Sequence, residues 1–479
     1  MTRHLAAVSA GSKRNDRASG LYVFALIIPI VFTTTLCILL SLYGRAPSAA
    51  RRFLTEIIIL VFTVVFNVTV LSDHISSVLG ILALLTVPAV LLSLRKWALE
   101  REDIEQGSPG EVGLLKRIRM KTSLVEITSK QPGYVTIFRS TVLLITVVCI
   151  LAVDFKVFPD YSFKTHKYGF SLMDVGIGLF VCSIAVVCNK PPMGHFKSTR
   201  NLLRLLWNVF PFMALGIGRA VVIKQIHYNQ AVTEYGEHWN AFLTLGFAKL
   251  IATLFASLVP HPKHLAYLAI AILGIHEFGL QFGLAEFVIS SRTGRKSLLT
   301  ANREGIVSTP GFVALQLAAM YLGYLLRPNK DSITVRELLN KILVFAFMSA
   351  VLWPVVFYIN SHFGVSRRIC NLGYVMWMLC ISTTMSVFFM LMELLAAIMA
   401  QHKGRDQHWL YVPLIMQSIN YNGLFFFLMA NVLTGMVNMS LDTTAVDTGN
   451  SLLILTTYMF INCLVITIFY IKKVRIKFW

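Results

Sequence analysis

Apolar residues fall in long runs along this 479-residue chain, and most polar residues lie in short segments between the runs. A helix needs about 20 apolar residues to cross the hydrocarbon layer of a membrane. The runs begin near Leu21, Phe53, Ile75, Val135, Gly169, Asn201, His238, His264, Pro310, Leu338, Gly373, Val412 and Ser451. The pattern predicts an all-α polytopic integral membrane protein with about 13 transmembrane helices. The weakest runs are the short one at Pro310 and the one at His264, which contains His276 and Glu277.

An odd number of crossings places the two ends of the chain on opposite sides of the membrane. The odd-numbered loops and the C-terminal tail hold the larger share of Lys and Arg, so the positive-inside rule assigns them to the cytoplasm. We therefore expect a lumenal N-terminal tail over residues 1–20 and a cytoplasmic tail over residues 472–479. Between them we expect one multi-span domain, 21–471, with a basic cytoplasmic loop at 95–134.

Composition supports the membrane assignment, because 56% of the residues are hydrophobic and only 14% are charged. The net charge of +20 is spread over short loops, which favours contact with membrane lipids and phosphate-bearing substrates rather than nucleic acid. The seven cysteines lie in or beside apolar runs without metal-type spacing, so we interpret them as buried thiols and expect no metal site.

The unusual polar clusters all fall in even-numbered loops, so they are predicted to meet on the lumenal face. Asp154 directly follows an apolar run, where partial burial should raise its pKa towards that of a general base. Lys164, His166 and Lys167 in the same loop could pair with it. The alternative is an interfacial carboxylate that only caps the end of a helix.

A second polar cluster, Glu234, Glu237 and His238, stands just before the seventh run. A carboxylate and an imidazole together suit removal of a proton from a hydroxyl. The alternative is an interfacial belt, because Tyr235 and Trp239 are typical of membrane boundaries.

Three arginines in the later even-numbered loops, Arg303, Arg367 and Arg368, could bind a phosphate through their planar guanidinium groups. Ordinary snorkelling to the interface is the alternative for each of them. Ionisable residues inside the runs, among them Glu56, Asp174, Arg219 and Glu393, are expected to pair with other groups, with a minority lining a cavity.

Several ordered segments resemble one known family. They are Ile150 to Phe155 with Phe158-Pro159, Ser171 to Gly178, Val232 to Asn240, Ala301 to Ile306, Val365 to Arg368, and Asn422 to Asn431 running on to Thr434 to Ser440. Together they resemble the GPI inositol acyltransferases, the PIG-W family of the endoplasmic reticulum. The N-terminal tail and residues 95–133 show no match.

The resemblance implies a multi-pass enzyme of the endoplasmic reticulum membrane. It would transfer a fatty acyl chain, typically palmitoyl, from acyl-CoA to the inositol ring of glucosaminyl-phosphatidylinositol during GPI-anchor assembly. Acyl-CoA would be a co-substrate, and no other cofactor is implied. Asp154 matches an acid that the family needs, and Lys164 matches a lysine ten residues later.

These matches give a hypothesis for the site. Asp154 accepts the hydroxyl proton, Lys164 orients the hydroxyl or stabilises the oxyanion, and His238 is the reserve base. The predicted substrate-binding residues are Asp174, Glu234, Glu237, Trp239, Asn240, Asn302, Arg303, Arg367, Arg368, Asn422 and Asn431. No serine elbow or placed cysteine indicates an acyl-enzyme, so direct transfer is expected.

A membrane transporter is the main alternative from another class, because many spans and several intramembrane charges are compatible with one. A transporter favours broken helices and polar groups near the membrane centre, whereas the densest polar segments here lie at one interface. The sequon at Asn438 lies close to the membrane, which disfavours its glycosylation.

Overall fold

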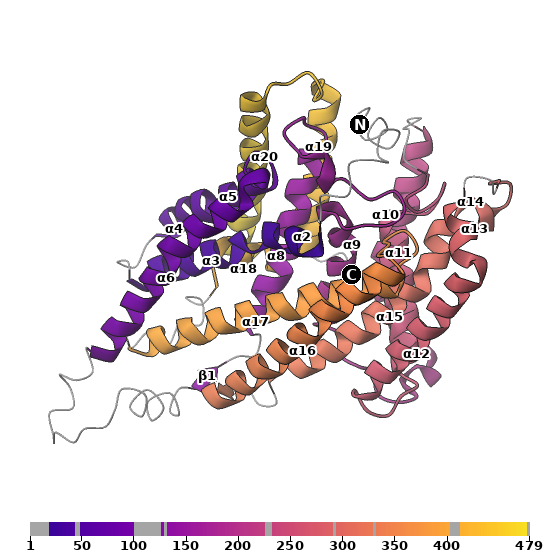
Figure 1. Ribbon diagram of the computed structural model, residues 1–479, viewed down its shortest axis with the longest axis horizontal. Coiled ribbons are helices and arrows are strands. Elements are labelled where there is room, and N and C mark those ends of the chain that lie inside the picture. Colours follow the sequence, from indigo (N-terminus) through magenta and orange to yellow (C-terminus); the bar gives the residue numbers. More distant parts are fainter. Residues whose placement is uncertain are drawn as a thin grey trace.

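The computed structural model of the chain is a bundle of helices (Figure 1). It describes residues 19–43, 48–99, 126–128, 132–225, 232–290, 294–328, 332–402 and 412–476. The predicted N-terminal tail 1–20 and the predicted basic loop 95–134 lie mostly outside these residues, as does the end of the C-terminal tail 472–479.

The first half of the chain forms the following elements, where η marks a 3₁₀ or π helix: α2 (Gly20–Ile27), α3 (Pro29–Tyr43), α4 (Ala49–Glu56), η2 (Ile57–Phe62), α5 (Thr63–Val68), η3 (Ser72–His74), α6 (Ile75–Leu99), β1 (Glu126–Thr128), α8 (Gly133–Ala152), η4 (Asp160–Ser162), α9 (Leu172–Ala185), η5 (His195–Lys197) and α10 (Thr199–Gln225). The second half forms α11 (Ala241–Ala256), α12 (His264–Gly279), η6 (Leu280–Leu284), α13 (Ala285–Ile289), α14 (Leu298–Ala301), α15 (Arg303–Leu326), β2 (Ser332–Thr334), α16 (Val335–His362), α17 (Leu372–His402), α18 (Leu414–Tyr421), α19 (Gly423–Ser440) and α20 (Thr448–Ile471).

Every predicted apolar run contains helix, which confirms the all-α membrane fold. Among the described residues, ten helices are long and apolar enough to cross a membrane. Helices suit this environment because they satisfy their own backbone hydrogen bonds in lipid. Of the remaining runs, α9 and α11 are shorter apolar helices, and residues 49–68 are interrupted by the π helix η2.

The two runs judged weakest differ from expectation. The run at Pro310 is not short, because α15 begins at Arg303 and covers 24 residues. Arg303 and Glu304 therefore lie in the first turn of a helix and not in a loop. The run at His264 continues through η6, where Gly283 has φ +108° and kinks the helix before α13.

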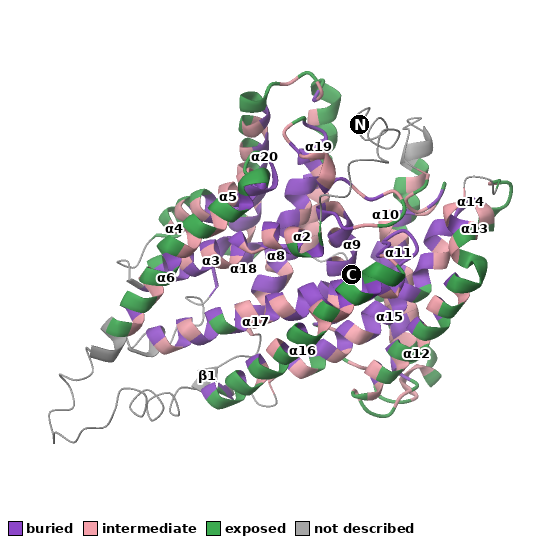
Figure 2. Ribbon diagram, in the orientation of Figure 1, coloured by how far each residue is buried: buried purple, intermediate pink, exposed green. Residues whose placement is uncertain are grey.

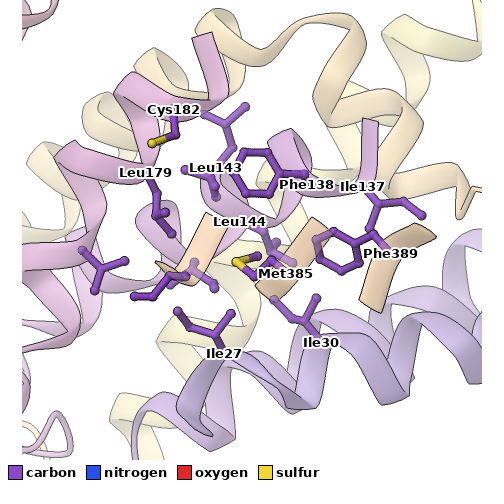
Figure 3. Close-up of a cluster of buried hydrophobic side chains, with 14 of the residues drawn as sticks. Ile27, Ile30, Ile137, Phe138, Leu143, Leu144, Leu179, Cys182, Met385 and Phe389 are labelled. Atoms are coloured by element: carbon purple, nitrogen blue, oxygen red, sulfur yellow. The ribbon is translucent and has the colours of Figure 1, made fainter. Parts of the chain in front are cut away.

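The helices divide into an inner and an outer set (Figure 2). The spans that contain α8, α15 and α17 have 67% of their most apolar window buried within the protein, whereas the span that contains α6 has 11%. Exposed leucines such as Leu84 and Leu92 show that α6 presents its apolar surface outward, as a lipid-facing helix would. Side chains from α2, α3, α8, α9 and α17 interlock in the central core (Figure 3).

A short antiparallel sheet was not predicted. β1 pairs with β2, with Ile127 opposite Ile333. The pair joins the segment before α8 to the start of α16, where Thr334 and Glu337 form a capping box.

Candidate functional site

The predicted polar segments meet at one end of the bundle, which we call the site face. It consists of residues 153–171, 232–240, 294–305 and 363–371 together with the end of α19. Four contacts join these segments: Asn438 Nδ2 donates to Asp154 Oδ2 at 2.8 Å, Lys164 Nζ lies 2.7 Å from Glu234 Oε2, the Ser366 hydroxyl donates to Lys167 O, and the His238 amide donates to Asn302 Oδ1 at 2.8 Å. The prediction that the even-numbered segments share a face is confirmed by these contacts.

Asp154 stands just beyond α8, where the helix ends at Ala152 and the chain turns. It is 9% exposed. The amide of Asn438, which reaches it from the end of α19, fixes the orientation of the carboxylate. The position is that of a carboxylate held at the site face with a defined geometry.

Asp174 and Arg367 form a buried ion pair, 1% and 4% exposed. Ser171 caps α9 by accepting from the Asp174 amide. The second carboxylate oxygen of Asp174 accepts from the Ser171 hydroxyl and from both the amide and the hydroxyl of Thr165. A buried pair with this many hydrogen bonds fixes the guanidinium of Arg367 in place.

The ring of Tyr235 lies 5.4 Å from the Arg367 guanidinium. Burial alone would lower the pKa of Arg367, but Tyr235, Asp174 and Glu234 favour the charged form and raise the pKa above its usual value. Arg367 therefore carries its positive charge in the folded protein.

The segment 232–240 is held on the start of α15 by Asn302, whose side-chain oxygen accepts from the amides of His238 and Trp239 at 2.8 and 3.0 Å. Gly236 has φ +122°, and a Cβ there would lie 2.6 Å from Asn302 Cα, so a glycine is required at this turn. Asn240 then caps α11 and also donates to Gly216 O at 2.7 Å. Asn240 and Asn302 thus position the segment that presents Glu234 and Tyr235.

A second buried acid, Glu304, is in contact with three arginines. Arg295 and Arg368 lie 2.5 and 2.8 Å from its carboxylate, and Arg303 lies 3.6 Å away. Arg303 and Arg368 also donate to the carbonyls of Ser290 and Val288. These contacts connect residues 288–290 and 294–304 to residues 363–371, and they commit Arg303 and Arg368 to protein partners.

An apolar cavity of about 210 Å³ extends from the site face into the helices. Its polar end consists of Lys164, Arg219, Tyr235 and Arg367. Its walls are lined by Ile27, Val142, Ile145, Thr146, Cys149, Ile150, Leu172, Met173, Val175, Gly176, Ile177, Leu179, Phe180, Phe212, Ala241, Phe242, Leu245, Leu424, Phe427 and Asn431. Such a cavity suits a long apolar chain attached to an anionic group.

The other predicted site residues lie in different settings. Glu237 and His238 are exposed at the site face, and Trp239 stacks on Phe247 at 5.1 Å. Asn431 lines the cavity. The structure does not bring Asn422 to the site: it bonds Val474 O and the Ile476 amide, at the end of α19 opposite Asn438. Its amide serves to hold the C-terminal segment.

Four contributors were not predicted as site residues. The sequence marks Asn438 only as a sequon, Tyr235 only as an interfacial aromatic and Arg219 only as an ionisable residue inside an apolar run, and Arg295 carries no signal beyond its charge. A polar residue at the end of a helix that faces a carboxylate on another segment is recognisable only once the helices are packed. Six of the seven cysteines are buried and Cys188 is half-buried, in line with their interpretation as thiols of the interior.

Among the residues that the structure describes, no group of three His, Cys, Asp or Glu side chains could hold a metal ion.

Comparison with known proteins places this architecture in a family. The sequence profile of the GWT1 family matches residues 10–469, which is nearly the whole chain. The chain belongs to the GWT1 family. The family predicted from the ordered segments is therefore confirmed, and the matched region includes the residues of both the cavity and the site face.

Three relatives illustrate the likeness. The human glucosaminyl-phosphatidylinositol-acyltransferase PIGW is 29% identical over 94% of this chain and 92% of its own. The phosphatidylinositol-glycan biosynthesis class W protein of Dictyostelium discoideum is 32% identical over 75% of this chain and 78% of its own. The GPI-anchored wall transfer protein 1 of Schizosaccharomyces pombe is 34% identical over 69% and 70%.

Proposed function

We propose that this GWT1-family chain is an acyl-CoA-dependent O-acyltransferase of the endoplasmic reticulum membrane that acylates the inositol ring of glucosaminyl-phosphatidylinositol. The names of its relatives support both the reaction class and the acceptor. None of the relatives compared above is named a transporter, so the alternative function has no support from them.

The single observation that carries the proposal is the cavity, apolar along its walls and cationic at the site face. A fatty acyl chain gains about 0.8 kcal/mol for each buried methylene, so apolar walls of this kind favour a long chain. Acyl-CoA and the phosphoinositide both carry phosphate groups, and Arg367, Lys164 and Arg219 supply positive charge where those groups would lie.

The chemistry that we propose is a direct transfer. The inositol hydroxyl attacks the thioester carbonyl as Asp154 accepts its proton, and the carbon–sulfur bond then breaks. The proton passes from Asp154 to the departing thiolate, which restores the carboxylate. Lys164, held by Glu234 beside the cavity, orients the hydroxyl or stabilises the oxyanion.

Two further assignments belong to this proposal. His238 remains the reserve base, because its exposed side chain lies in the segment that Asn302 docks at the site face. We assign the site face to the lumen on the distribution of Lys and Arg between the loops. Contacts that join segments distant in sequence support a single face, and accessibility labelling of Asp154→Cys and His238→Cys would test the side.

Substitution Asp154→Asn tests the proposal directly. The amide is isosteric and keeps a polar contact with Asn438, so the protein should fold normally in detergent. Acylation of glucosaminyl-phosphatidylinositol in microsomes should fall by at least about a hundredfold, the usual contribution of a general base. Asp160→Asn, in the same segment, is the matched control and should retain activity. Full activity of Asp154→Asn would remove Asp154 from the role.

Mass spectrometry of lipid intermediates tests the reaction itself. Cells that lack this protein should accumulate non-acylated glucosaminyl-phosphatidylinositol, and the wild-type chain should restore the acylated form. Substrate uptake into proteoliposomes without any acylated product would instead establish transport.

A further inference from the structure

Gly176 is an unusual residue in the cavity wall. It lies inside α9, where glycine is about 1 kcal/mol less favourable than alanine. A Cβ at Gly176 would meet no atom within 4 Å, and its backbone φ is not positive. Within the part of the chain that the structure describes, nothing therefore requires the absence of a side chain.

Gly178, two residues further along α9, provides a contrast. A Cβ at that position would lie 2.7 Å from the Tyr374 hydroxyl and would clash with Met378, so helix packing explains this glycine. Gly176 is the only glycine among the described residues that line the cavity. A glycine with open space in front of it suits close approach of a ligand to the backbone.

Three aromatic rings meet in the cavity wall. Phe180 is four residues after Gly176 and so lies on the same side of α9. Its ring meets Phe427 edge-on at 5.6 Å, and Phe427 meets Phe242 at 5.8 Å. We call Phe180, Phe242 and Phe427 the ring cluster; all three line the cavity.

The positions of the lining residues place part of this cluster deeper in the cavity than the site face. Phe180 is the last lining residue of α9 and lies nine positions after Ser171 of the site face, or roughly 13 Å along the helix at about 1.5 Å per residue. Phe427 packs on Phe180, whereas Phe242, in the first turn of α11, lies nearer the site face. Phe180 and Phe427 therefore bound the part of the cavity where the end of an acyl chain would lie.

Another part of the cavity wall has little freedom to yield. Ile27 and Leu179 line the cavity and belong to the packed core with Leu144, Met385 and Phe389 (Figure 3). Core side chains at this packing density resist displacement. Changes in cavity length are therefore expected at Gly176 and at the rings, not at this wall.

We propose that the acyl chain passes over Gly176 and ends against the ring cluster, so that these residues select acyl donors by chain length. The inference rests on the proposed acyltransferase function and deepens it. Burial of each additional methylene changes affinity about fourfold, so a cavity of fixed length discriminates strongly between chains that differ by a few carbons.

Filling the space at Gly176 is the first test. Gly176→Leu should place a side chain in the cavity, lower transfer of palmitoyl from palmitoyl-CoA at least tenfold, and leave transfer from a donor several carbons shorter largely intact. Gly176→Ala should give a smaller shift in the same direction while preserving or raising thermal stability, because alanine favours helix. Gly274→Leu is the matched control, since a Cβ there also meets nothing within 4 Å but α12 does not line the cavity.

Opening the ring cluster is the reciprocal test. Phe427→Ala should move the preference towards donors longer than that of the wild type. Phe425→Ala is the control on the same helix, because Phe425 stacks on Phe469 at 5.4 Å and does not line the cavity. Each variant is assayed in microsomes with saturated acyl-CoAs of graded length and with glucosaminyl-phosphatidylinositol as acceptor.

The outcomes separate this inference from the function on which it rests. Opposite shifts in chain preference for Gly176→Leu and Phe427→Ala, with unchanged controls, establish the length selection. An active wild type whose chain-length profile is the same in both folded variants overturns the inference and leaves the acyltransferase function standing. A wild type that transfers no acyl chain at all refutes the proposed function instead.

Discussion

Carboxylates at the two ends of the bundle have different partners. At the site face, Asp154, Asp174 and Glu234 all bind side chains from other segments. At the opposite end, Glu393 accepts from the Tyr134 amide at the start of α8 at 2.6 Å. Glu56 accepts from the amides of Leu414 and Ile415 at the start of α18 at 2.8 and 2.7 Å.

The difference in partners distinguishes carboxylates that stabilise the fold from carboxylates that can take part in the reaction. The first amides of a helix have no partner within the helix, and α8 and α18 begin just after Pro132 and Pro413. A carboxylate that satisfies such amides inside the protein stabilises the fold and has little capacity left for a ligand. At the site face, Lys164 and Arg367, which pair with Glu234 and Asp174, also line the cavity, so we assign catalysis to the site face alone.

Lys164→Gln should have the largest effect on activity of the variants that test this comparison, and it should leave the fold intact. The ion pair with Glu234 is partly exposed, with side chains 25% and 19% accessible, so its loss should change stability by less than about 1 kcal/mol. Loss of the cation beside the reacting atoms should lower acylation about a hundredfold or more. Single-turnover acylation by purified protein and thermal unfolding in detergent measure the two effects.

Lys167→Gln is the control for this experiment, because Lys167 in the same segment contributes only its carbonyl, which accepts from the Ser366 hydroxyl. If Lys164→Gln lost stability and activity in parallel, its role would be structural, and the division between the two ends would fail.

The fold was largely predictable because lipid imposes a simple rule on sequence. Apolar runs of sufficient length must be helical, and each predicted run contains helix. The boundaries were less predictable. The sequence predicts a loop at Arg303, where α15 begins, because arginine and glutamate interrupt the apolar pattern. The structure buries both residues through their mutual pairing.

The sequence predicted which segments form the site, but it did not predict which side chains contact one another. Polar clusters in even-numbered loops predicted the shared face, but the partners depend on packing. Lys164 pairs with Glu234, and the Asn438 amide binds Asp154; no local pattern gives either contact. Asn422 shows the converse, since it lies in a segment that resembles the family but bonds the C-terminal segment. Resemblance identifies residues that a fold needs as readily as those that a reaction needs.

Glu56→Ala tests the structural end of the comparison and should have the next largest effect. It leaves two buried amides without an acceptor and removes the partner of Arg52 at 3.8 Å. Each unsatisfied buried donor costs about 1–3 kcal/mol, so the midpoint of thermal unfolding should fall clearly. Acylation per folded molecule should remain at the wild-type level.

Glu56→Gln keeps one acceptor and should lose less stability, and Glu286→Ala, an exposed acid in α13, should lose none. A drop in specific activity with wild-type stability would bring Glu56 into the reaction and contradict the assignment of catalysis to one end.

Asn438→Ala should have the smallest effect, and it tests how far the partner of Asp154 contributes to activity at the site face. It removes the amide that holds Asp154 but leaves the carboxylate in place. A hydrogen bond to a charged group contributes about 1.5 kcal/mol or more, so acylation should fall about tenfold.

Asn438 also begins a sequon with Met439 and Ser440, which offers a control. Ser440→Ala abolishes the sequon and removes only a hydroxyl that donates to Met436 O. If the Asn438 amide acts on Asp154, only Asn438→Ala loses activity, and neither variant changes its mobility on a gel. Equal losses in both variants, with a shift in mobility, would mean that a glycan and not the amide is what matters there, because a glycosylated Asn438 could not hold Asp154 in this geometry.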